Sequence, residues 1–334
     1  MTLSRNPLPT VDELGAPASL RYSPSLSSIL LDKTVSFPGT DCLIKSNVPL
    51  STLTSFQVGG PAEWYVAPHS VQELQLSLAW ALDRDIPITL LGAGSNLLIS
   101  DRGLPGLVVG TRHLKQVIFD EENGLLTVGA GTMLPLLAQR VAKRGWRGLE
   151  WAVGIPGTIG GSVVMNAGAH GGCISDILVE VQVLNMDGSC EVLKADQLAY
   201  RYRTSNLQGG GRLVTQATFQ MQPGFDPVDV RRDTDYHLNQ RHSTQPYDRP
   251  SCGSVFRNPD AYKAGWLIEQ AGLKGYQIGG AKVAERHANF ILNCGEATAT
   301  DIFRLIHHVQ RRVEQQWSLR LEPEVRILGD FQAA

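Results

Sequence analysis

Residues 148–172 constrain the fold more than any other part of the chain. The stretch reads GLEWAVGIPGTIGGSVVMNAGAHGG and holds eight glycines and one proline, Pro156. Glycine at this density lowers backbone order, so folding alone is a poor explanation for it. Glycines let backbone N–H groups approach a phosphate or a ring carbonyl closely, which predicts a ligand-binding surface. Taken alone, the stretch is also compatible with tight turns between short strands.

A second glycine-rich segment follows a short apolar strand predicted at residues 86–91. It covers residues 92–96 and reads GAGSN. Its two glycines resemble a dinucleotide fingerprint, but Leu97 replaces the third glycine, and the next residues are too few and too apolar for a crossover helix. The segment therefore predicts a strand, a phosphate-binding loop and a second strand. Backbone amides, Ser95 and Asn96 would hold a diphosphate in this loop without a helix dipole.

Composition is that of an ordinary globular protein. The 334 residues can bury a sizeable core in two or three lobes, and the formal net charge is only −2. The chain therefore has no broad basic charge that would indicate binding to nucleic acid or to anionic membranes. No apolar run reaches the roughly 18–20 residues of a membrane span, and the N-terminal residues do not have the pattern of a signal peptide.

The cysteines indicate a reducing compartment. There are five of them, an odd number, widely spread and without a CxxC pair. This pattern argues against a disulfide framework and against a zinc site. We therefore expect a cytoplasmic protein without a metal ion.

Hydrophobic periodicity predicts a mixed α+β chain that follows a poorly ordered extension at residues 1–41. Strands are expected at 54–68 (a pair around Gly59-Gly60-Pro61), 86–91, 107–109, 117–119, 125–129, 177–185 and 324–328. Helices are expected at 71–84, 134–144, 228–240 and 264–271. A last helix is expected to begin at Thr300-Asp301 as its N-cap, with a buried apolar face from Ile302 to Trp317.

Four motifs occur in an order that is typical of one enzyme family. They are TSFQVGGPA at 54–62, the loop at 92–96, GIPGTIGG at 154–161 and NAGA at 166–169. With them, residues 47–329 resemble the UDP-N-acetylenolpyruvoylglucosamine reductases. Only 51 positions separate Arg203 from Ser254, which resembles the compact subclass of that family.

The resemblance implies a fold and a reaction. The fold is α+β, an FAD-binding fold of the vanillyl-alcohol oxidase/p-cresol methylhydroxylase type with a C-terminal α+β substrate lobe. The reaction is the NADPH-dependent reduction of UDP-N-acetylglucosamine-enolpyruvate to UDP-N-acetylmuramate through non-covalent FAD, in peptidoglycan precursor synthesis. The implied parts are an FAD-binding domain in two lobes at 42–224, a substrate-binding domain at 225–321, and a C-terminal strand at 322–334 that returns towards the flavin.

The same resemblance implies which residues hold the flavin. All of them belong to the phosphate loop or to the glycine-rich stretch. They are Gly92, Ala93, Gly94, Ser95, Asn96, Gly154, Ile155, Gly157, Thr158, Gly160, Gly161, Asn166 and Gly168.

Three further residues in family motifs are candidates for the chemistry. Hydride addition to the enolpyruvyl group builds negative charge beside the carboxylate, so the site needs a fixed cation, a hydrogen-bonded acid and a proton donor. The resemblance assigns these roles to Arg203, Glu324 and Ser254 respectively. The alternative for Arg203 is a solvated arginine on a strand, on which Arg201 would face the same side. The alternative for Ser254 is a serine that only forms part of a turn. Glu322 is expected to face solvent.

Donors are also needed for the diphosphate and uridine of the substrate. Asn258 matches a family position for this, and Arg241, Gln245 and Tyr247 lie just before the serine motif, which reads PSCGSVFRNP at 250–259.

Two other functions remain open from the residues. One is a flavin-dependent alcohol oxidase of the same superfamily, in which His170 or Cys173 could attach the flavin covalently. The other is a non-catalytic UDP-sugar or nucleotide sensor, which the joint presence of Arg203, Ser254 and Glu324 disfavours.

Overall fold

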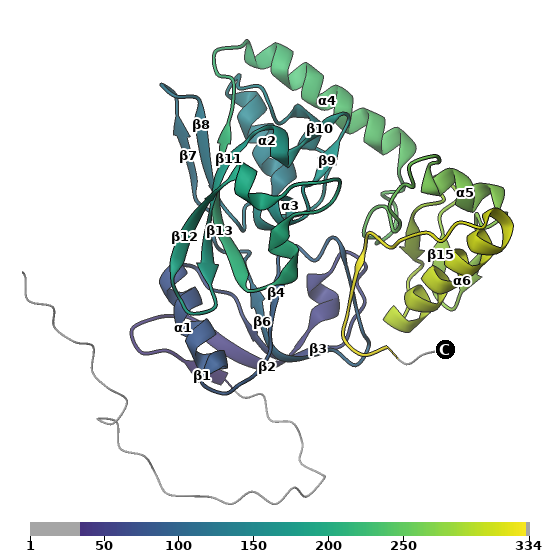
Figure 1. The fold of residues 1–334 in the computed structure, drawn as a ribbon, viewed down its shortest axis with the longest axis horizontal. Helices are drawn as coiled ribbons and strands as arrows, with labels where there is room; N and C mark the ends of the chain where they lie inside the picture. The colour runs from purple at the N-terminus through teal and green to yellow at the C-terminus, as the bar shows by residue number, and fades with distance from the viewer. Residues whose placement is uncertain (1–33, 332–334) are drawn as a thin grey trace, which may run out of the picture. The chain divides into compact units, whose positions relative to one another are not determined.

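The computed structural model describes residues 34–331 (Figure 1). Residues 1–33 of the predicted extension lie outside the described residues. The boundary at residue 41 is wrong, because β1 (Thr34–Ser36) pairs antiparallel with β2 (Leu43–Pro49). Val35 and Phe37 pack against the buried Cys42 and Ile44. A strand of three residues is too short to show a period in the sequence, which explains the error.

The first sheet has five strands in the order β1-β2-β3-β6-β4. Its other strands are β3 (Pro61–Val66), β6 (Leu104–Gly110) and β4 (Ile88–Leu91), which run parallel to one another. Helix α1 (Val71–Leu82) begins at Ser70, whose hydroxyl accepts from the Glu73 amide, and packs Leu74 and Leu78 into the same core. Of the strand pair predicted at 54–68, the second strand is confirmed as β3, but the first is wrong. Residues 54–60 form a turn, closed by the Gln57 amide on Thr54 O, and an irregular segment, in which Gly60 O accepts from the Leu50 amide.

The second sheet is antiparallel, in the order β12-β11-β13-β8-β7. Its strands are β12 (Cys190–Lys194), β11 (Leu178–Asn185), β13 (Arg212–Gln220), β8 (Leu125–Gly129) and β7 (Val117–Asp120). Helices α2 (Leu134–Lys143) and α3 (Ile159–Val164) bury their apolar residues against it. Gly145, at φ +72°, follows the end of α2, as expected of a helix stop.

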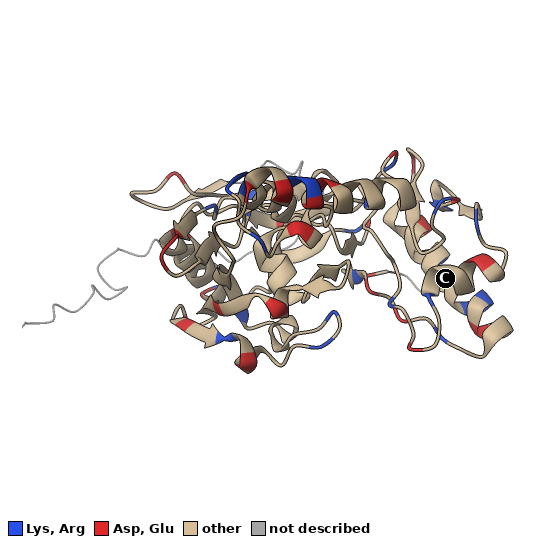
Figure 2. Ribbon diagram, turned by 90° about the horizontal axis from the view of Figure 1, so that it is seen from above, with Lys and Arg blue, Asp and Glu red and all other residues tan. Residues whose placement is uncertain are grey.

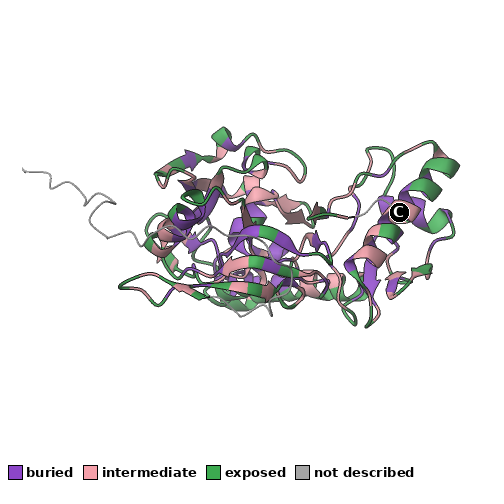
Figure 3. Cartoon of the chain, turned by 90° about the horizontal axis from the view of Figure 1, so that it is seen from below, coloured by how far each residue is buried: buried purple, intermediate pink, exposed green. Residues whose placement is uncertain are grey.

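The glycine-rich stretch contains more than turns. It forms the 3-10 helix η3 (Glu150–Ala152), helix α3, and a hairpin of β9 (Gly168–Ala169) with β10 (Gly172–Cys173). Figure 3 shows buried residues gathered within the sheet and helix layers, with exposed residues on the outer turns.

The C-terminal lobe packs around a core that also includes Phe56, Val58 and Leu98 from the first part of the chain. Helices α5 (Ala264–Gln270) and α6 (Ala299–Trp317) pack with a small sheet in the order β14-β15-β16. Those strands are β14 (Gln277–Ile278), β15 (Ala281–Val283) and β16 (Ile291–Asn293). The expected apolar face of α6 is confirmed, since Ile302, Leu305, Ile306, Val309 and Val313 are buried.

The predicted N-cap of α6 is two residues too late. Thr298 is the N-cap, and its hydroxyl and the Asp301 carboxylate exchange hydrogen bonds with each other's backbone amides at 3.0 Å. Thr300 donates instead to Asp101, in the turn after β5 (Leu97–Ile99). The sequence TATD offers two threonines, and only the contact with Asp101 decides between them.

Helix α4 (Pro227–Thr244) packs against α2 and η3, with Leu238 on the core of the second sheet. Arg147 and Asp233 form an ion pair across this contact at 2.9 Å. The predicted helix at 228–240 is confirmed, and its few apolar residues face the second sheet although its composition is polar. Both signs of charge are spread along the ribbon of the described chain (Figure 2).

The chain closes with β17 (Arg326–Leu328), which pairs parallel with β5. The C-terminal segment therefore lies beside the strand that follows the phosphate loop. No helix in residues 34–331 is both long and apolar enough to cross a membrane.

Candidate active site

The phosphate loop at 92–96 lies directly against the glycine-rich stretch. Ser95 Oγ donates to Pro156 O at 3.0 Å. A Cβ atom on Gly92 would lie 2.6 Å from Thr158 Oγ1, and one on Gly157 would lie 3.1 Å from Ser95 Oγ. Two segments some sixty positions apart in the sequence thus form one surface. Glycine is favoured most clearly at Gly157, which has φ +138° and also adjoins the Ser95 hydroxyl.

The loop at 92–96 is held in place by Arg112, a residue that the sequence did not reveal. Arg112 donates from Nη2 to Leu53 O at 2.8 Å and from Nε to Gly92 O at 3.4 Å. Gly94 has φ +66°, and a Cβ there would lie 2.3 Å from Leu53 O. Gly94 is therefore needed for close contact with the protein's own backbone, and its predicted contact with the flavin stays a prediction. A lone arginine after β6 carries no motif that could have revealed Arg112.

Unpaired donors mark this surface as a ligand site. None of the backbone N–H groups of residues 93–96 donates to an acceptor within the described chain. The hydroxyls of Thr158 and Thr132 are buried and have no hydrogen-bond partner among residues 34–331. Buried polar groups are almost always paired, so these groups point to a bound acceptor. A diphosphate fits, since it offers acceptor oxygens to a nest of amides and hydroxyls.

Other predicted flavin residues have protein partners. Asn96 Nδ2 donates to Glu324 O at 3.1 Å, and the Asn166 amide binds Arg201 O and the Ser175 amide. Gly160 packs on Ala130, and its amide donates to Ala130 O at 2.9 Å. These contacts show that part of the motif holds the site together.

The remaining predicted flavin residues lie along the same loops. Ala93 and Ile155 are half-buried, and Gly161 is exposed. Gly168 belongs to the β9–β10 hairpin, where a Cβ would lie 2.6 Å from Gly172 O.

Arg203 and Glu324 form the centre of the site. Arg203 Nε lies 2.9 Å from Glu324 Oε1, and Arg203 Nη2 donates to Gly168 O at 2.7 Å. Their side chains are only 22% and 15% exposed. Burial raises the pKa of Glu324, while the charges of Arg203 and then Arg257 act in the opposite direction. Arg203 thus joins the glycine-rich stretch, through Gly168, to the C-terminal segment, through Glu324.

Arg201 and Arg203 do not share a face, which corrects the expectation of a strand. Residues 201–204 form a turn, in which the amide of each end donates to the carbonyl of the other. Arg203 has φ +54° and points to Glu324, whereas Arg201 is exposed. Glu322 is exposed, as expected.

Ser254 lies on the segment next to Glu324. Its backbone pairs with Phe290, and the following Val255 O accepts from the Glu324 amide at 2.7 Å. The Ser254 side chain is half-buried, and its hydroxyl has no partner in the described chain. Below it, burial and the Glu324 charge raise the pKa of Cys252, which keeps that thiol neutral.

Arg257 is a second cation that the sequence analysis did not select. Its Nη2 donates to Arg203 O at 3.3 Å, and its charge lowers the pKa of Glu324. It stands three residues after Ser254, inside the serine motif, so its position in that motif was the available signal.

The predicted substrate residues fall into two groups. Arg241 Nε donates to Tyr247 Oη at 3.3 Å, and Tyr247 Oη donates to Gly154 O at 3.5 Å, so both lie at the glycine-rich stretch. Asn258 instead accepts from the Ala264 amide at the start of α5, and Gln245 ends α4. Arg241 and Tyr247 therefore lie at the glycine-rich stretch, whereas Asn258 and Gln245 contact the ends of helices α5 and α4.

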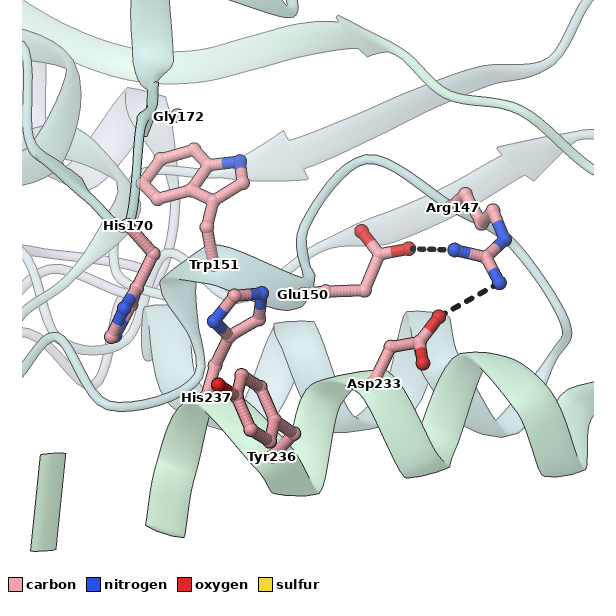
Figure 4. Close-up of a pocket in the computed structure, with 8 residues that line it drawn as sticks. All are labelled: Arg147, Glu150, Trp151, His170, Gly172, Asp233, Tyr236 and His237. Carbon is pink, nitrogen blue, oxygen red and sulfur yellow. Dashed lines mark ion pairs between the residues drawn. The ribbon is translucent and has the colours of Figure 1, made fainter. Parts of the chain in front are cut away.

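A separate pocket lies between the β9–β10 hairpin and α4 (Figure 4). His170, at φ +52° in the hairpin turn, packs its ring 4.5 Å from that of His237. Burial lowers the pKa of His170. Across the pocket, Arg147 is held between Glu150 and Asp233. None of the predicted flavin, catalytic or substrate residues lines this pocket.

Two family models match the chain. The FAD binding domain matches residues 62–194, and the UDP-N-acetylenolpyruvoylglucosamine reductase C-terminal domain matches residues 245–328. The first match covers the loop at 92–96 and the glycine-rich stretch, and the second covers Ser254 and Glu324.

Curated relatives match along most of the chain. The UDP-N-acetylenolpyruvoylglucosamine reductase of Nostoc sp. is 61% identical over 302 residues, which is 90% of this chain and 91% of the relative. That of Acaryochloris marina is 58% identical over 307 residues, 92% of this chain and 98% of the relative.

A solved structure is also similar. The UDP-N-acetylenolpyruvylglucosamine reductase of Thermus caldophilus superposes with a TM-score of 0.73 at 33% identity, covering 90% of this chain and 100% of that one. With the match to the FAD binding domain, this confirms the predicted α+β FAD-binding fold with a C-terminal lobe.

Proposed function

The chain belongs to the UDP-N-acetylenolpyruvoylglucosamine reductase family, and we propose that Arg203, Glu324 and Ser254 carry out the chemistry of that family in it. The protein is an FAD-dependent oxidoreductase that reduces UDP-N-acetylglucosamine-enolpyruvate to UDP-N-acetylmuramate with NADPH, in peptidoglycan precursor synthesis. The resemblance seen in its motifs is thereby confirmed, and the reductase is favoured over an alcohol oxidase or a sensor.

The loop surface suits the diphosphate of FAD. The free amides of residues 93–96, together with the hydroxyls of Thr158 and Thr132, would hold its oxygens. The chemistry that bound FAD would supply is hydride transfer between NADPH and the substrate. Arg112 and Gly94 would keep the loop in the shape that presents these donors.

Arg203 is proposed to bind the carboxylate of the enolpyruvyl group. Its Nε and Nη2 are held by Glu324 and Gly168, while Nη1 donates to no acceptor within residues 34–331. The free N–H groups of the planar guanidinium can hold the carboxylate as negative charge develops beside it. The contacts with Glu324 and Gly168 fix the orientation in which the guanidinium meets the carboxylate.

Glu324 is proposed to hydrogen-bond the developing enol. Its carboxyl is mostly buried and beside Arg203, and burial raises its pKa. A carboxyl group shifted in this direction binds a proton more readily, so it can donate to an oxygen on which negative charge develops.

Ser254 is proposed to supply the proton. Its hydroxyl is free of protein partners, and its backbone is held by Phe290 on one side and, through Val255, by Glu324 on the other. A serine is a weak acid, but it is strong enough to protonate a carbanion if it is close and rigid. Arg241 and Tyr247, beside Gly154, are proposed to face the UDP-sugar, and Asn258 and Gln245 stay predictions as substrate residues.

The division of the chain into parts is also a proposal. The flavin part is proposed to extend from Thr34 to residue 224 and to include α4, because α4 packs on α2. The substrate part would then cover residues 245–321, followed by the closing strand. A cytoplasmic location is supported by the five cysteines, none of which forms a disulfide.

The observation that carries the proposed site is the 2.9 Å contact between Arg203 and Glu324, which joins the flavin part to the C-terminal segment. Its test is the absorption spectrum of the purified protein under anaerobic conditions. We expect flavin bands that NADPH bleaches and that the enolpyruvyl substrate restores without oxygen. Bands restored only by oxygen would indicate an oxidase, and a colourless protein that cannot take up FAD would exclude both enzymes.

Arg203→Lys should slow the substrate-dependent step and leave flavin reduction by NADPH nearly unchanged. Lysine keeps the charge but cannot bridge Glu324, Gly168 and a carboxylate with a planar set of donors. Rapid-mixing absorbance separates the two steps. Arg201→Lys, two positions away on the exposed side of the same turn, is the matched control and should change neither. Equal damage to both steps would show that Arg203 has a general structural role.

A further inference from the structure

Arg203 occupies a backbone conformation that the residue itself disfavours. Its φ of +54° lies in the left-handed region, where a side chain with a Cβ atom crowds the backbone. Such a conformation persists only where neighbouring groups hold it. The direction of the guanidinium depends on it, because the side chain starts from this backbone.

The contacts that hold Arg203 converge on its carbonyl oxygen. Gln208 Nε2 donates to Arg203 O at 2.9 Å, and Arg257 Nη2 donates to the same oxygen at 3.3 Å. Gln208 belongs to the 3-10 helix η6 (Asn206–Gly209), which begins at Ser205. In this left-handed turn the Arg203 carbonyl therefore faces the side chains of Gln208 and Arg257.

Gln208 also reaches the glycine-rich stretch. Its Nε2 lies 3.2 Å from Val164 O, at the end of α3, and 3.4 Å from Met165 Sδ. Ser205 Oγ donates to the same Val164 O at 2.7 Å. A primary amide has two N–H groups, so one can hold Arg203 while the other holds α3. Gln208 thus ties the arginine turn to the segment that also carries Gly168.

We propose that Gln208 is a positioning residue, whose amide holds Arg203 in its left-handed turn and so directs the guanidinium at Glu324 and Gly168. This rests on the proposed role of Arg203. Gln208 is uncharged, and among the three residues proposed to carry the chemistry its side chain contacts Arg203 alone. Arg326, beyond Glu324, reaches only the backbone carbonyl of Gln208, at 3.5 Å, which a side-chain substitution keeps. Arg257 is less suited to the role, since its bond is longer and its charge also acts on Glu324.

Gln208→Met tests the proposal in the FAD-loaded protein. Methionine has a similar length but no N–H group, so the Arg203 carbonyl loses its shorter hydrogen bond. Gln220→Met is the matched control. The Gln220 amide also has three acceptors nearby, the backbone carbonyls of Asn123, Gly124 and Met221, in another part of the chain.

Two measurements report the result. Hydrogen–deuterium exchange of peptides covering residues 200–205 should speed up in Gln208→Met and not in Gln220→Met. The rate at which the enolpyruvyl substrate reoxidises the flavin should fall by about 10²-fold, the typical loss when a group is displaced by about 1 Å. Flavin content and reduction by NADPH should stay normal. In an Arg203→Lys background, Gln208→Met should slow substrate-dependent reoxidation further by less than about threefold. The effects of residues that act as a unit are not additive.

Three outcomes decide the matter. Unchanged exchange at 200–205 would overturn the positioning role, whatever the rates. A full additional loss in the Arg203→Lys background would also overturn it, since Gln208 would then act independently of Arg203. Faster exchange with normal substrate rates in both Gln208→Met and Arg203→Lys would support the positioning role but overturn the proposed function of Arg203.

Discussion

Replacing Ser254 with alanine should slow the reoxidation of flavin by the enolpyruvyl substrate by about 10²–10⁴-fold, the usual contribution of a positioned proton donor. The structure gives the reason, because the Ser254 hydroxyl has no protein partner while its backbone adjoins both Phe290 and the Glu324 segment. Removing the hydroxyl therefore breaks no contact within the described chain. FAD content, reduction by NADPH and substrate affinity should change little, since the proton is needed mainly in the transition state.

Two further variants make this prediction specific. Ser254→Cys should recover part of the rate, because a thiol keeps a transferable proton in nearly the same place. Ser251→Ala, a half-buried serine three positions earlier, is the control and should react at the normal rate. The measurement is rapid-mixing absorbance of the flavin, once with NADPH and once with the substrate. If Ser254→Ala reoxidises normally, the proton must come from Glu324 or from water.

Gly94→Val should abolish FAD binding. A Cβ at this position would lie 2.3 Å from Leu53 O and 2.8 Å from Thr54 Cα, and φ there is +66°. Backbone atoms cannot yield as a flexible side chain can, so the loop must move away from Leu53. The amides of residues 93–96 would then no longer converge on a diphosphate, and Arg112 could not hold both Leu53 and Gly92.

Gly188→Val is the matched control for Gly94→Val. Gly188 also has a positive φ, +83°, but no atom within 4 Å of where a Cβ would be. It therefore carries only the conformational cost, about 1–2 kcal/mol. We expect one FAD per chain in Gly188→Val and none in Gly94→Val, measured by absorbance after desalting. Circular dichroism of both variants distinguishes a damaged loop from an unfolded chain, and full FAD in a folded Gly94→Val would exclude Gly94 from a role in the loop's shape.

Sequence reasoning was most accurate where structure is local. The strand–loop–strand arrangement at 86–99 was confirmed, because the short apolar run after the loop cannot form a crossover helix. The buried stripe of α6 was visible as a helical period. It failed at Thr298, where the deciding contact comes from the distant Asp101. It also failed at β1, a three-residue strand that only its pairing with β2 defines.

The sequence by itself determined the family, the phosphate loop, and the identity of Arg203, Ser254 and Glu324 as candidates. Each is visible because the residue types and their close spacing form a motif. Only the tertiary structure decided what these residues contact. Arg203 and Glu324 are 121 positions apart and meet at 2.9 Å, and the side chain of Asn96 donates to the backbone carbonyl of Glu324. Periodicity and turn chemistry act over a few residues, whereas such pairings depend on how separate packed layers close on one another.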